Sequence, residues 1–344
     1  MKKQILLTTI YCLFLAACQG QQADLVGSAP NLIISTPAVG QILTVPAQMP
    51  PTPTSNPNAA PSASIPQTGG KIPNFDHIIL TVLENEDYSA VIGNTQMPQL
   101  NALAKKYVTL SNYFAVAHPS LPNYIALMSG DTQNITSDCT KCFISSAPNL
   151  ADLIEASGRT WKTYEEDMPS ACFVGDKKLY AQKHDPLIYF DSVRLNPARC
   201  SQNIVPLPQL DSDLAANKLP NFSFVMANLC NSGHDCTPAV ADAWIGSLVS
   251  KLTASPAVGK NSLIIVVYDE GAEGSKTSCC GLLGKGGGQV AALFISPLAK
   301  PGFSDNTAYD HYSVTKTILS AWNLPALGNT RNAAVLPVAA PFLP

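Results

Sequence analysis

The stretch Ser262-Leu-Ile-Ile-Val-Val-Tyr268 is an uninterrupted run of mostly apolar, β-branched residues, and Asp269-Glu270 follows it directly. A short run of this kind is typical of a strand that is buried on both faces of a parallel sheet. A second such run, His77–Leu83, ends in Glu84-Asn85. Two buried strands that each end in acidic residues predict an α/β sheet with polar side chains gathered at one edge.

Strand-like and helix-like segments alternate over most of the chain after about residue 72. We expect further strands at 108–114, 160–164, 222–227 and 289–296, and helices at 97–107, 149–157, 239–252 and 310–322. This alternation predicts a three-layer α/β/α sandwich around a mainly parallel sheet. The segment from 165 to about 221 has no clear period, and we expect it to form a long connection over the mouth of a site.

Ser120 stands in Ala117-His-Pro-Ser-Leu-Pro-Asn-Tyr124, where two prolines bracket it and an apolar run of helical character follows. Proline is tolerated in the first turn of a helix, so Ser120 is expected at or just before a helix N-terminus. The unpaired N–H groups and the helix dipole at such a position suit a phosphate group. An ordinary N-cap serine is the alternative that the local sequence leaves open.

Polar residues follow three predicted strands and open two predicted helices. Because the carboxyl ends of parallel strands share one edge of a sheet, these side chains can meet there. Their oxygens favour Ca²⁺, Mg²⁺ or Mn²⁺, with Zn²⁺ not excluded, and such a cation would neutralise charge on a phosphoryl group. The two histidines can bind phosphate oxygens or protonate a leaving alcohol, whereas His77 and His184 are expected to be structural. The candidate set is Glu84, Asn85, Ser120, His234, Asp269, Glu270 and His311.

The first 18 residues have the features of an export signal. Lys2 and Lys3 precede an apolar run that is too short to span a membrane, and Leu15-Ala-Ala-Cys18 resembles the bacterial lipobox. This resemblance implies lipidation of Cys18, with plain secretion as the alternative. Without the leader the formal charge is 19 − 24 = −5. A mildly acidic chain offers no electrostatic basis for binding nucleic acid.

Residues 19–72 are rich in Pro, Ser, Thr, Ala and Gln and carry almost no charge. Such a composition cannot bury a core, so it predicts a disordered tether between the lipid anchor and a folded domain at 73–344. That remainder is long enough for one sizeable α/β domain. The protein is therefore expected in the bacterial cell envelope, touching the membrane only through its N-terminal lipid, or secreted.

Eight cysteines remain after the leader, and an even number in an exported chain predicts disulfides. Cys139-Thr-Lys-Cys142 has metal or redox spacing, but without a second such motif a structural bridge is the better interpretation. The pairs 172 with 200 and 230 with 236 are close enough in sequence to be plausible. The sequence does not determine the connectivity of Cys139, Cys142, Cys172, Cys200, Cys230, Cys236, Cys279 and Cys280.

Five motifs stand in this order along the chain: Leu83-Glu84-Asn85-x-x-Tyr88, His118-Pro-Ser-x-Pro-Asn123-Tyr, Gly233-His234-Asp235, Tyr268-Asp269-Glu270 and His311-Tyr-Ser. Together they resemble the phosphoesterase family, which unites bacterial and fungal acid phosphatases with phosphatidylcholine-type phospholipases C. The resemblance implies an alkaline-phosphatase-like fold, and a phosphorylated hydroxyl that falls on Ser120. It also implies a metal held by the acids of two strand ends with Asn85 and Ser120, and phosphoryl oxygens bound by Asn85, Asn123, His234 and His311.

Only 34 residues separate Asn85 from Ser120, whereas some relatives carry a large insertion there. The short segment favours the acid-phosphatase branch, a metal-dependent hydrolase of phosphate monoesters with no obligatory protein partner. Ser232 stands where the family often has Asp, so the sequence leaves open which side chain supports His234. It also leaves open the roles of His118 and Asp235. The alternatives are a phospholipase C-type phosphodiesterase on the same fold and a non-catalytic surface-binding lipoprotein.

Overall fold

The computed structural model of this chain describes residues 71–342. The predicted signal peptide, the lipidation site Cys18 and nearly all of the predicted tether lie outside the described residues, so they stay predictions. Within 71–342, every helix is too short or too polar to cross a lipid bilayer.

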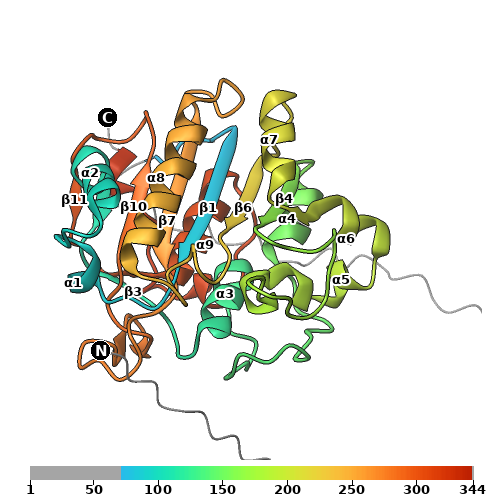
Figure 1. Cartoon of the computed structure of the whole chain (residues 1–344), viewed down its shortest axis with the longest axis horizontal. Coiled ribbons are helices and arrows are strands. Elements are labelled where there is room, and N and C mark those ends of the chain that lie inside the picture. The colour runs from blue at the N-terminus through green and yellow to red at the C-terminus, as the bar shows by residue number, and fades with distance from the viewer. Residues whose placement is uncertain (1–70, 343–344) are drawn as a thin grey trace, which may run out of the picture. The chain divides into compact units, whose positions relative to one another are not determined.

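One eight-stranded sheet with helices on both faces organises the described residues (Figure 1). Neighbouring strands run parallel, except that β10 is antiparallel to both of its neighbours, β2 and β7. This confirms the predicted mainly parallel α/β architecture. The order across the sheet is β11 (Ser304–Asp305), β2 (Val108–Leu110), β10 (Ala292–Ile295), β7 (Ser262–Tyr268), β1 (His77–Leu83), β6 (Phe222–Met226), β4 (Trp161–Glu165) and β5 (Ile204–Pro206).

The two central strands coincide with the two apolar runs that the sequence singles out. All of β7 is buried, as is β1 beyond its first residue, since helices cover both faces of the sheet. The strands are parallel and in register, with Leu83 beside Tyr268. As a result, Glu84 and Asp269 leave the sheet side by side.

Helices cover the two faces of the sheet in pairs. One pair is α2 (Pro98–Lys106) with α8 (Pro238–Ala254), and the other is α3 (Ser120–Ser129) with α9 (His311–Ala321). Figure 1 shows α8 in front of the sheet and α9 behind it. The shorter helices are α1 (Tyr88–Val91), α4 (Leu150–Ala156), α5 (Asp191–Arg194), α6 (Pro197–Asn203) and α7 (Pro208–Ala215), with 3₁₀ turns η1 (Gln182–His184), η2 (Pro186–Tyr189), η3 (Gly328–Arg331) and η4 (Ala340–Phe342).

Two expectations about secondary structure were incomplete. The single strand expected at 108–114 is divided into β2 and β3 (Tyr113–Phe114), and β3 pairs with β12 (Tyr309–Asp310) outside the main sheet. The connection after residue 165 contains several short helices. Three of them begin at a proline, which is favoured in the first turn of a helix: Pro186, Pro197 and Pro208. A small hairpin, β8 (Cys280–Gly281) with β9 (Gly284–Lys285), lies in the glycine-rich loop.

The eight cysteines of the described residues form four disulfides. Cys139–Cys142, Cys172–Cys200 and Cys230–Cys236 match the structural pairs that the sequence made plausible. The adjacent Cys279 and Cys280 form the fourth. Cys172–Cys200 joins the start of the long connection to α6, and therefore closes a loop that includes η1 and η2.

Candidate active site

Three carboxylates gather where β1 and β7 end. Glu84 and Asp269 are fully buried, and Glu270 is nearly so. The backbone N–H of Asn85 donates to Asp269 Oδ1 at 3.0 Å, which ties the two strand ends together. Asn85 has a φ of 62°, a left-handed conformation that asparagine tolerates better than most residues. The turn after β1 therefore needs a residue such as asparagine in order to present this N–H group.

Ser120 is the first residue of α3 and is 1% exposed. Pro119 occupies the N-cap position, so the serine does not cap its own helix and its hydroxyl is available for other contacts. Ser120 Oγ donates a hydrogen bond to Glu270 Oε1 at 3.0 Å. One hydrogen bond therefore joins the start of α3 to the end of β7, although 150 residues separate them in sequence.

Glu84 faces side chains that stabilise its negative charge. His184 Nε2 lies 2.8 Å from Glu84 Oε1, the Tyr124 hydroxyl donates to the same oxygen, and Lys183 Nζ lies 3.7 Å from Oε2. Burial favours the neutral carboxyl, but His184, then Lys183 and Tyr124, outweigh it and lower the pKa of Glu84 to about 2. Glu84 is accordingly ionised at neutral pH despite complete burial.

The pKa of Asp269 is shifted in the opposite direction from that of Glu84. Burial, followed by the charges of Glu84 and Glu270, raises the pKa of Asp269 well above its usual range. Its Oδ2 is buried and, within residues 71–342, has no hydrogen-bond partner. An unpartnered buried carboxylate oxygen between two other acids is a position where a cation would lower the energy of the protein.

The donor chemistry of this edge fits a hard divalent cation, because Glu84, Asn85, Ser120, Asp269 and Glu270 offer oxygen atoms. As the side chains lie, no three His, Cys, Asp or Glu residues of the described chain converge on a common point as metal ligands. Lys183 and His184 instead occupy part of the space around Glu84. Metal binding at this edge is therefore a proposal that rests on donor type and on the unpartnered Asp269 oxygen.

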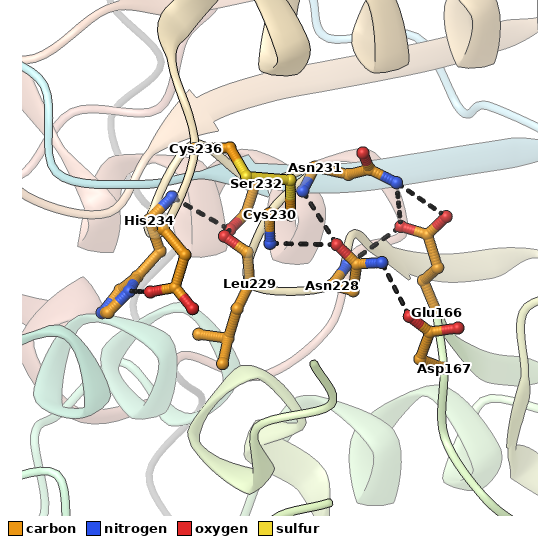
Figure 2. Close-up of a disulfide and its surroundings, with 10 residues drawn as sticks. Glu166, Asp167, Asn228, Leu229, Cys230, Asn231, Ser232, His234 and Cys236 are labelled. Atoms are coloured by element: carbon orange, nitrogen blue, oxygen red, sulfur yellow. Dashed lines mark hydrogen bonds and ion pairs between the residues drawn. A yellow bond between two sulfur atoms is a disulfide. The ribbon is translucent and has the colours of Figure 1, made fainter. Parts of the chain in front are cut away.

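His234 lies in the loop after β6, which the Cys230–Cys236 disulfide closes (Figure 2). Its Nδ1 is 2.6 Å from Asp235 Oδ1, and its Nε2 is 3.9 Å from Glu84 Oε2. The side chain is 32% exposed, so its Nε2 can reach a ligand from solvent. Ser232, where the resemblance led us to expect Asp, accepts from the His234 backbone N–H at 3.4 Å and so supports the loop rather than the ring.

The base of this loop is held by a polar network that Figure 2 shows. Asn228 Oδ1 accepts from the N–H groups of Cys230 and Asn231, at 3.0 and 2.8 Å. Glu166 in turn accepts from the Asn231 side chain and from the Asn228 N–H. The disulfide and this network together fix the direction from which His234 approaches Glu84.

His311 is placed differently from the role that the resemblance implied. Its Nε2 lies 2.6 Å from the carbonyl oxygen of Asp269 and its Nδ1 lies 2.7 Å from the Tyr113 hydroxyl. Because a carbonyl only accepts, Nε2 carries the proton and Nδ1 accepts from Tyr113. Burial lowers the pKa of His311 to about 4. Both ring nitrogens are occupied, so His311 here orients the Asp269 backbone instead of facing a phosphate.

Asn123 is likewise occupied by the protein. Its Oδ1 accepts from the N–H groups of Val116 and Ala117, both at 3.0 Å. Its Nδ2 donates to the carbonyls of Ala117 and Pro119, at 2.9 and 3.2 Å. Both N–H donors of this amide are used, so Asn123 shapes the turn that presents Ser120, and its predicted contact with a phosphoryl oxygen stays a prediction.

His118 contacts the acid that Ser120 also contacts. Its Nδ1 is paired with Glu270 Oε2, and its Nε2 lies 2.8 Å from the carbonyl oxygen of Ser278. The hydrogen bond with Glu270 is the largest of the effects that raise the pKa of His118. His118 thus connects the Ser120 turn and the glycine-rich loop to Glu270.

Four residues at this edge were not predicted to belong to the site: Tyr124, Asp138, Lys183 and His184. The structure places His184, expected to be structural, against Glu84. The spacing of Tyr124, four residues after Ser120 on one helix, is a signal that could have identified it. Lys183 and His184 carry no such signal, because they come from the aperiodic connection and only its path brings them to Glu84.

Comparisons with known proteins agree with the fold and identify the family of this chain. The model of the Phosphoesterase family matches residues 94–325. Over 263 residues the chain is 33% identical to a probable acid phosphatase of Kluyveromyces lactis, covering 74% of this chain and 60% of that protein. A phosphate-repressible acid phosphatase of Penicillium chrysogenum has the same identity and coverage. The chain therefore spans about 60% of the length of these fungal relatives.

A phosphatidylinositol-3-phosphatase of Mycobacterium tuberculosis is 32% identical over 277 residues, which cover 78% of this chain and 85% of that protein. Among solved structures, an alkaline phosphatase superfamily protein from Vibrio parahaemolyticus superposes with a TM-score of 0.51 at 14% identity, covering 74% and 68% of the two chains. The lipoteichoic acid synthase LtaP of Listeria monocytogenes gives 0.52 at 12% identity, covering 75% and 74%. These structures establish the fold alone, and the sequence matches establish the family: the chain belongs to the phosphoesterase family and has the α/β fold of the alkaline phosphatase superfamily.

Proposed function

We propose that this protein hydrolyses phosphate monoesters and that Ser120 is the nucleophile. The observation that carries the proposal is the position of Ser120 Oγ at the start of α3, hydrogen-bonded to Glu270 and 3.2 Å from Lys183 Nζ. A proton acceptor and a cation within hydrogen-bond distance of the same hydroxyl favour its action as a nucleophile. The names of the relatives, two acid phosphatases and a phosphatidylinositol-3-phosphatase, support monoesters over diesters.

In the first step, Ser120 Oγ forms a bond to phosphorus while the bond from phosphorus to the alcohol oxygen breaks. The Ser120 proton passes to Glu270, which already accepts it in a hydrogen bond. The alcohol takes a proton from His234, whose Nδ1 is held by Asp235 while its Nε2 remains accessible. In the second step, water attacks phosphoserine and gives its proton to His234, and Ser120 recovers its own proton from Glu270.

We propose that Glu84, Asn85, Ser120, Asp269 and Glu270 hold one divalent cation, with Ca²⁺, Mg²⁺ or Mn²⁺ favoured over Zn²⁺. When bound, such a cation lowers the pKa of a nearby hydroxyl and neutralises charge on a phosphoryl group. The contribution of the chain is to keep Glu84 ionised and to leave one Asp269 oxygen without a protein partner. His311 and Asn123 contribute indirectly, since they fix the Asp269 backbone and the Ser120 turn.

We further propose that the enzyme works in the cell envelope on a phosphate ester of low molecular mass, anchored through a lipid on Cys18. The leader, the Leu15-Ala-Ala-Cys18 motif and the uncharged segment that follows support this location. Replacement of Cys18 with Ala in the producing cell should move the protein from the membrane fraction to the soluble fraction. A Cys18→Ala protein that stays in the membrane fraction would contradict the lipid anchor.

The deciding experiment compares p-nitrophenyl phosphate with p-nitrophenyl phosphorylcholine as substrates of the purified, metal-supplemented protein. We expect the monoester to be strongly preferred, and an acid quench during turnover to leave phosphate on Ser120 that mass spectrometry detects. A preference for the choline ester would favour the phospholipase C alternative on the same fold. Turnover of neither ester would favour a non-catalytic surface-binding lipoprotein.

A further inference from the structure

Lys183 comes from η1, far in sequence from both strand ends, yet its ammonium lies at the centre of the candidate site. Lys183 Nζ is 3.2 Å from Ser120 Oγ, 3.1 Å from Asp138 Oδ2 and 3.7 Å from Glu84 Oε2. Its side chain is 12% exposed. An ammonium has three N–H donors, and three oxygens surround this one.

We propose that Lys183 is a catalytic residue, an inference that rests on the proposed function. Its ammonium donates to Ser120 Oγ in the resting protein, so it touches the reacting atom directly. During attack it neutralises the negative charge that develops on this oxygen and on the transferred phosphoryl group. A positive charge that is already in place in a water-poor site stabilises such a transition state more than a mobile one would.

Asp138 is the residue that orients Lys183. Its Oδ2 accepts from Lys183 at 3.1 Å, while its Oδ1 accepts from the Leu121 N–H at 2.9 Å in the first turn of α3. The Cys139–Cys142 disulfide follows Asp138 immediately and restrains its loop. A lysine side chain is long and flexible, so this second anchor is needed to hold the ammonium over Ser120. Asp138 is accordingly a positioning residue.

The distances from Lys183 Nζ to its neighbours distinguish a catalytic role from that of a simple buried ion pair with Glu84. Lys183 is within hydrogen-bond distance of Ser120 and Asp138 but not of Glu84, which at 3.7 Å receives only its charge. Three carboxylates, Glu84, Asp269 and Glu270, line the same edge. A phosphate dianion entering among them would be repelled even with one divalent cation bound, and the Lys183 charge reduces that repulsion.

The test compares Lys183→Met and Lys183→Arg with Lys177→Met, a control at an exposed lysine of the same connection. For each metal-supplemented protein we would measure kcat and KM with p-nitrophenyl phosphate, the inhibition constant of vanadate, the bound metal and Tm. We expect Lys183→Met to lower kcat by about 10²–10³-fold, with a smaller change in KM, weaker vanadate binding and unchanged metal content. The kcat of Lys183→Arg should be at least ten-fold higher than that of Lys183→Met, and the kcat of Lys177→Met should match that of the wild type.

Asp138→Asn provides a second, milder variant if Lys183→Met does not fold, and we expect it to lower kcat by about ten-fold. The assignment is overturned if Lys183→Met, or Asp138→Asn in its place, keeps a kcat within three-fold of the control. It is also overturned if the loss of activity follows loss of metal, because Lys183 would then act only on the metal site. An active Ser120→Ala protein would instead overturn the proposed function, so the two failures are distinguishable.

Discussion

Two clusters of buried carboxylates lie at the ends of parallel strands, and they differ in the groups that face them. At the end of β1, Glu84 meets the basic side chains Lys183 and His184. At the end of β4, Glu165 lies near Asp185, and both are buried. The segment 183–185 contributes to both clusters, with two basic residues on the first and an acid on the second.

The consequences for charge are opposite. The basic neighbours lower the pKa of Glu84 to about 2 against the effect of burial. Burial, and then the charge of Asp185, raises the pKa of Glu165 well above its usual range, and burial raises that of Asp185 to about 8. Acids at strand ends are therefore not sufficient to mark a site. Glu84 is held in its charged state, which suits a site for a cation and a phosphate, whereas burial favours the protonated forms of Glu165 and Asp185.

The largest expected effect is at the nucleophile of the first cluster. Ser120→Ala removes the atom that bonds to phosphorus, so we expect kcat for p-nitrophenyl phosphate to fall by on the order of 10⁴-fold or more. Acid-quenched Ser120→Ala protein should carry no phosphate by mass spectrometry. Ser145→Ala, at an exposed serine, is the control. Normal activity in Ser120→Ala would show that Ser120 is not the nucleophile and that the first cluster is not the active site.

The next effect concerns the cation. Asp269→Asn keeps an oxygen that can accept from the Asn85 N–H but replaces the unpartnered Oδ2 with an NH₂ group, which cannot bind a cation. We expect loss of bound metal in elemental analysis and a fall in kcat of on the order of 10²–10³-fold, as with a chelator. Asp211→Asn, at an exposed acid paired with Lys251, should change neither. Full metal content in Asp269→Asn would show that the proposed ligand set is incorrect.

Stability of the metal-free protein tests the charged state of Glu84. Its folded pKa lies below the usual 4.5, so its ionised form stabilises the fold above about pH 4.5, and this contribution is lost as pH falls toward 2. Glu84→Gln should therefore lower the free energy of unfolding by about 3 kcal/mol at pH 7. The difference from wild type should shrink between pH 4.5 and 3 in urea titrations. A difference independent of pH would contradict the charged state.

The smallest effect on activity is expected at the second cluster, where the effect of pH on stability has the opposite sign. In the unfolded chain Asp185 ionises above about pH 3.8, but in the fold it stays protonated up to about pH 8. The wild type therefore loses stability as pH rises through this window. Asp185→Asn, which stays neutral, should be more stable than wild type by several kcal/mol at pH 8, about 1.4 kcal/mol for each pH unit above 3.8, and little different at pH 4. Asp76→Asn, at an exposed acid, is the control, and a destabilised Asp185→Asn at pH 8 would show that this carboxyl is charged in the fold.

The sequence located the central part of the fold well, because its signals are local. The runs 77–83 and 262–268 coincide with β1 and β7, since a strand buried on both faces must be apolar throughout. The start of α3 at Ser120 follows from the flanking prolines. The division of 108–114 into β2 and β3 was missed, because it depends on strand partners, Tyr309–Asp310 among them, almost 200 residues away.

The candidate site shows the same limit. Glu84, Ser120, Asp269 and Glu270 could be placed at one edge because parallel topology brings strand ends together. Asn123 and His311 were assigned by resemblance to the phosphate, yet their hydrogen bonds in this arrangement are spent on the protein. The hydrogen-bond partners of a side chain depend on which backbone groups the completed fold leaves free beside it, and no local pattern encodes them.

The amino-acid sequence by itself determined the apolar strands, the helix that begins at Ser120, the acids after β1 and β7, and membership of the phosphoesterase family. These follow from residue type and short-range order, which decide what can be buried and where a helix can begin. Only the tertiary structure decided that Lys183 and His184 face Glu84 while Asp185, the next residue, turns to Glu165. Whether a buried acid is charged depends on neighbours within a few ångströms, and the path of the whole chain selects those neighbours.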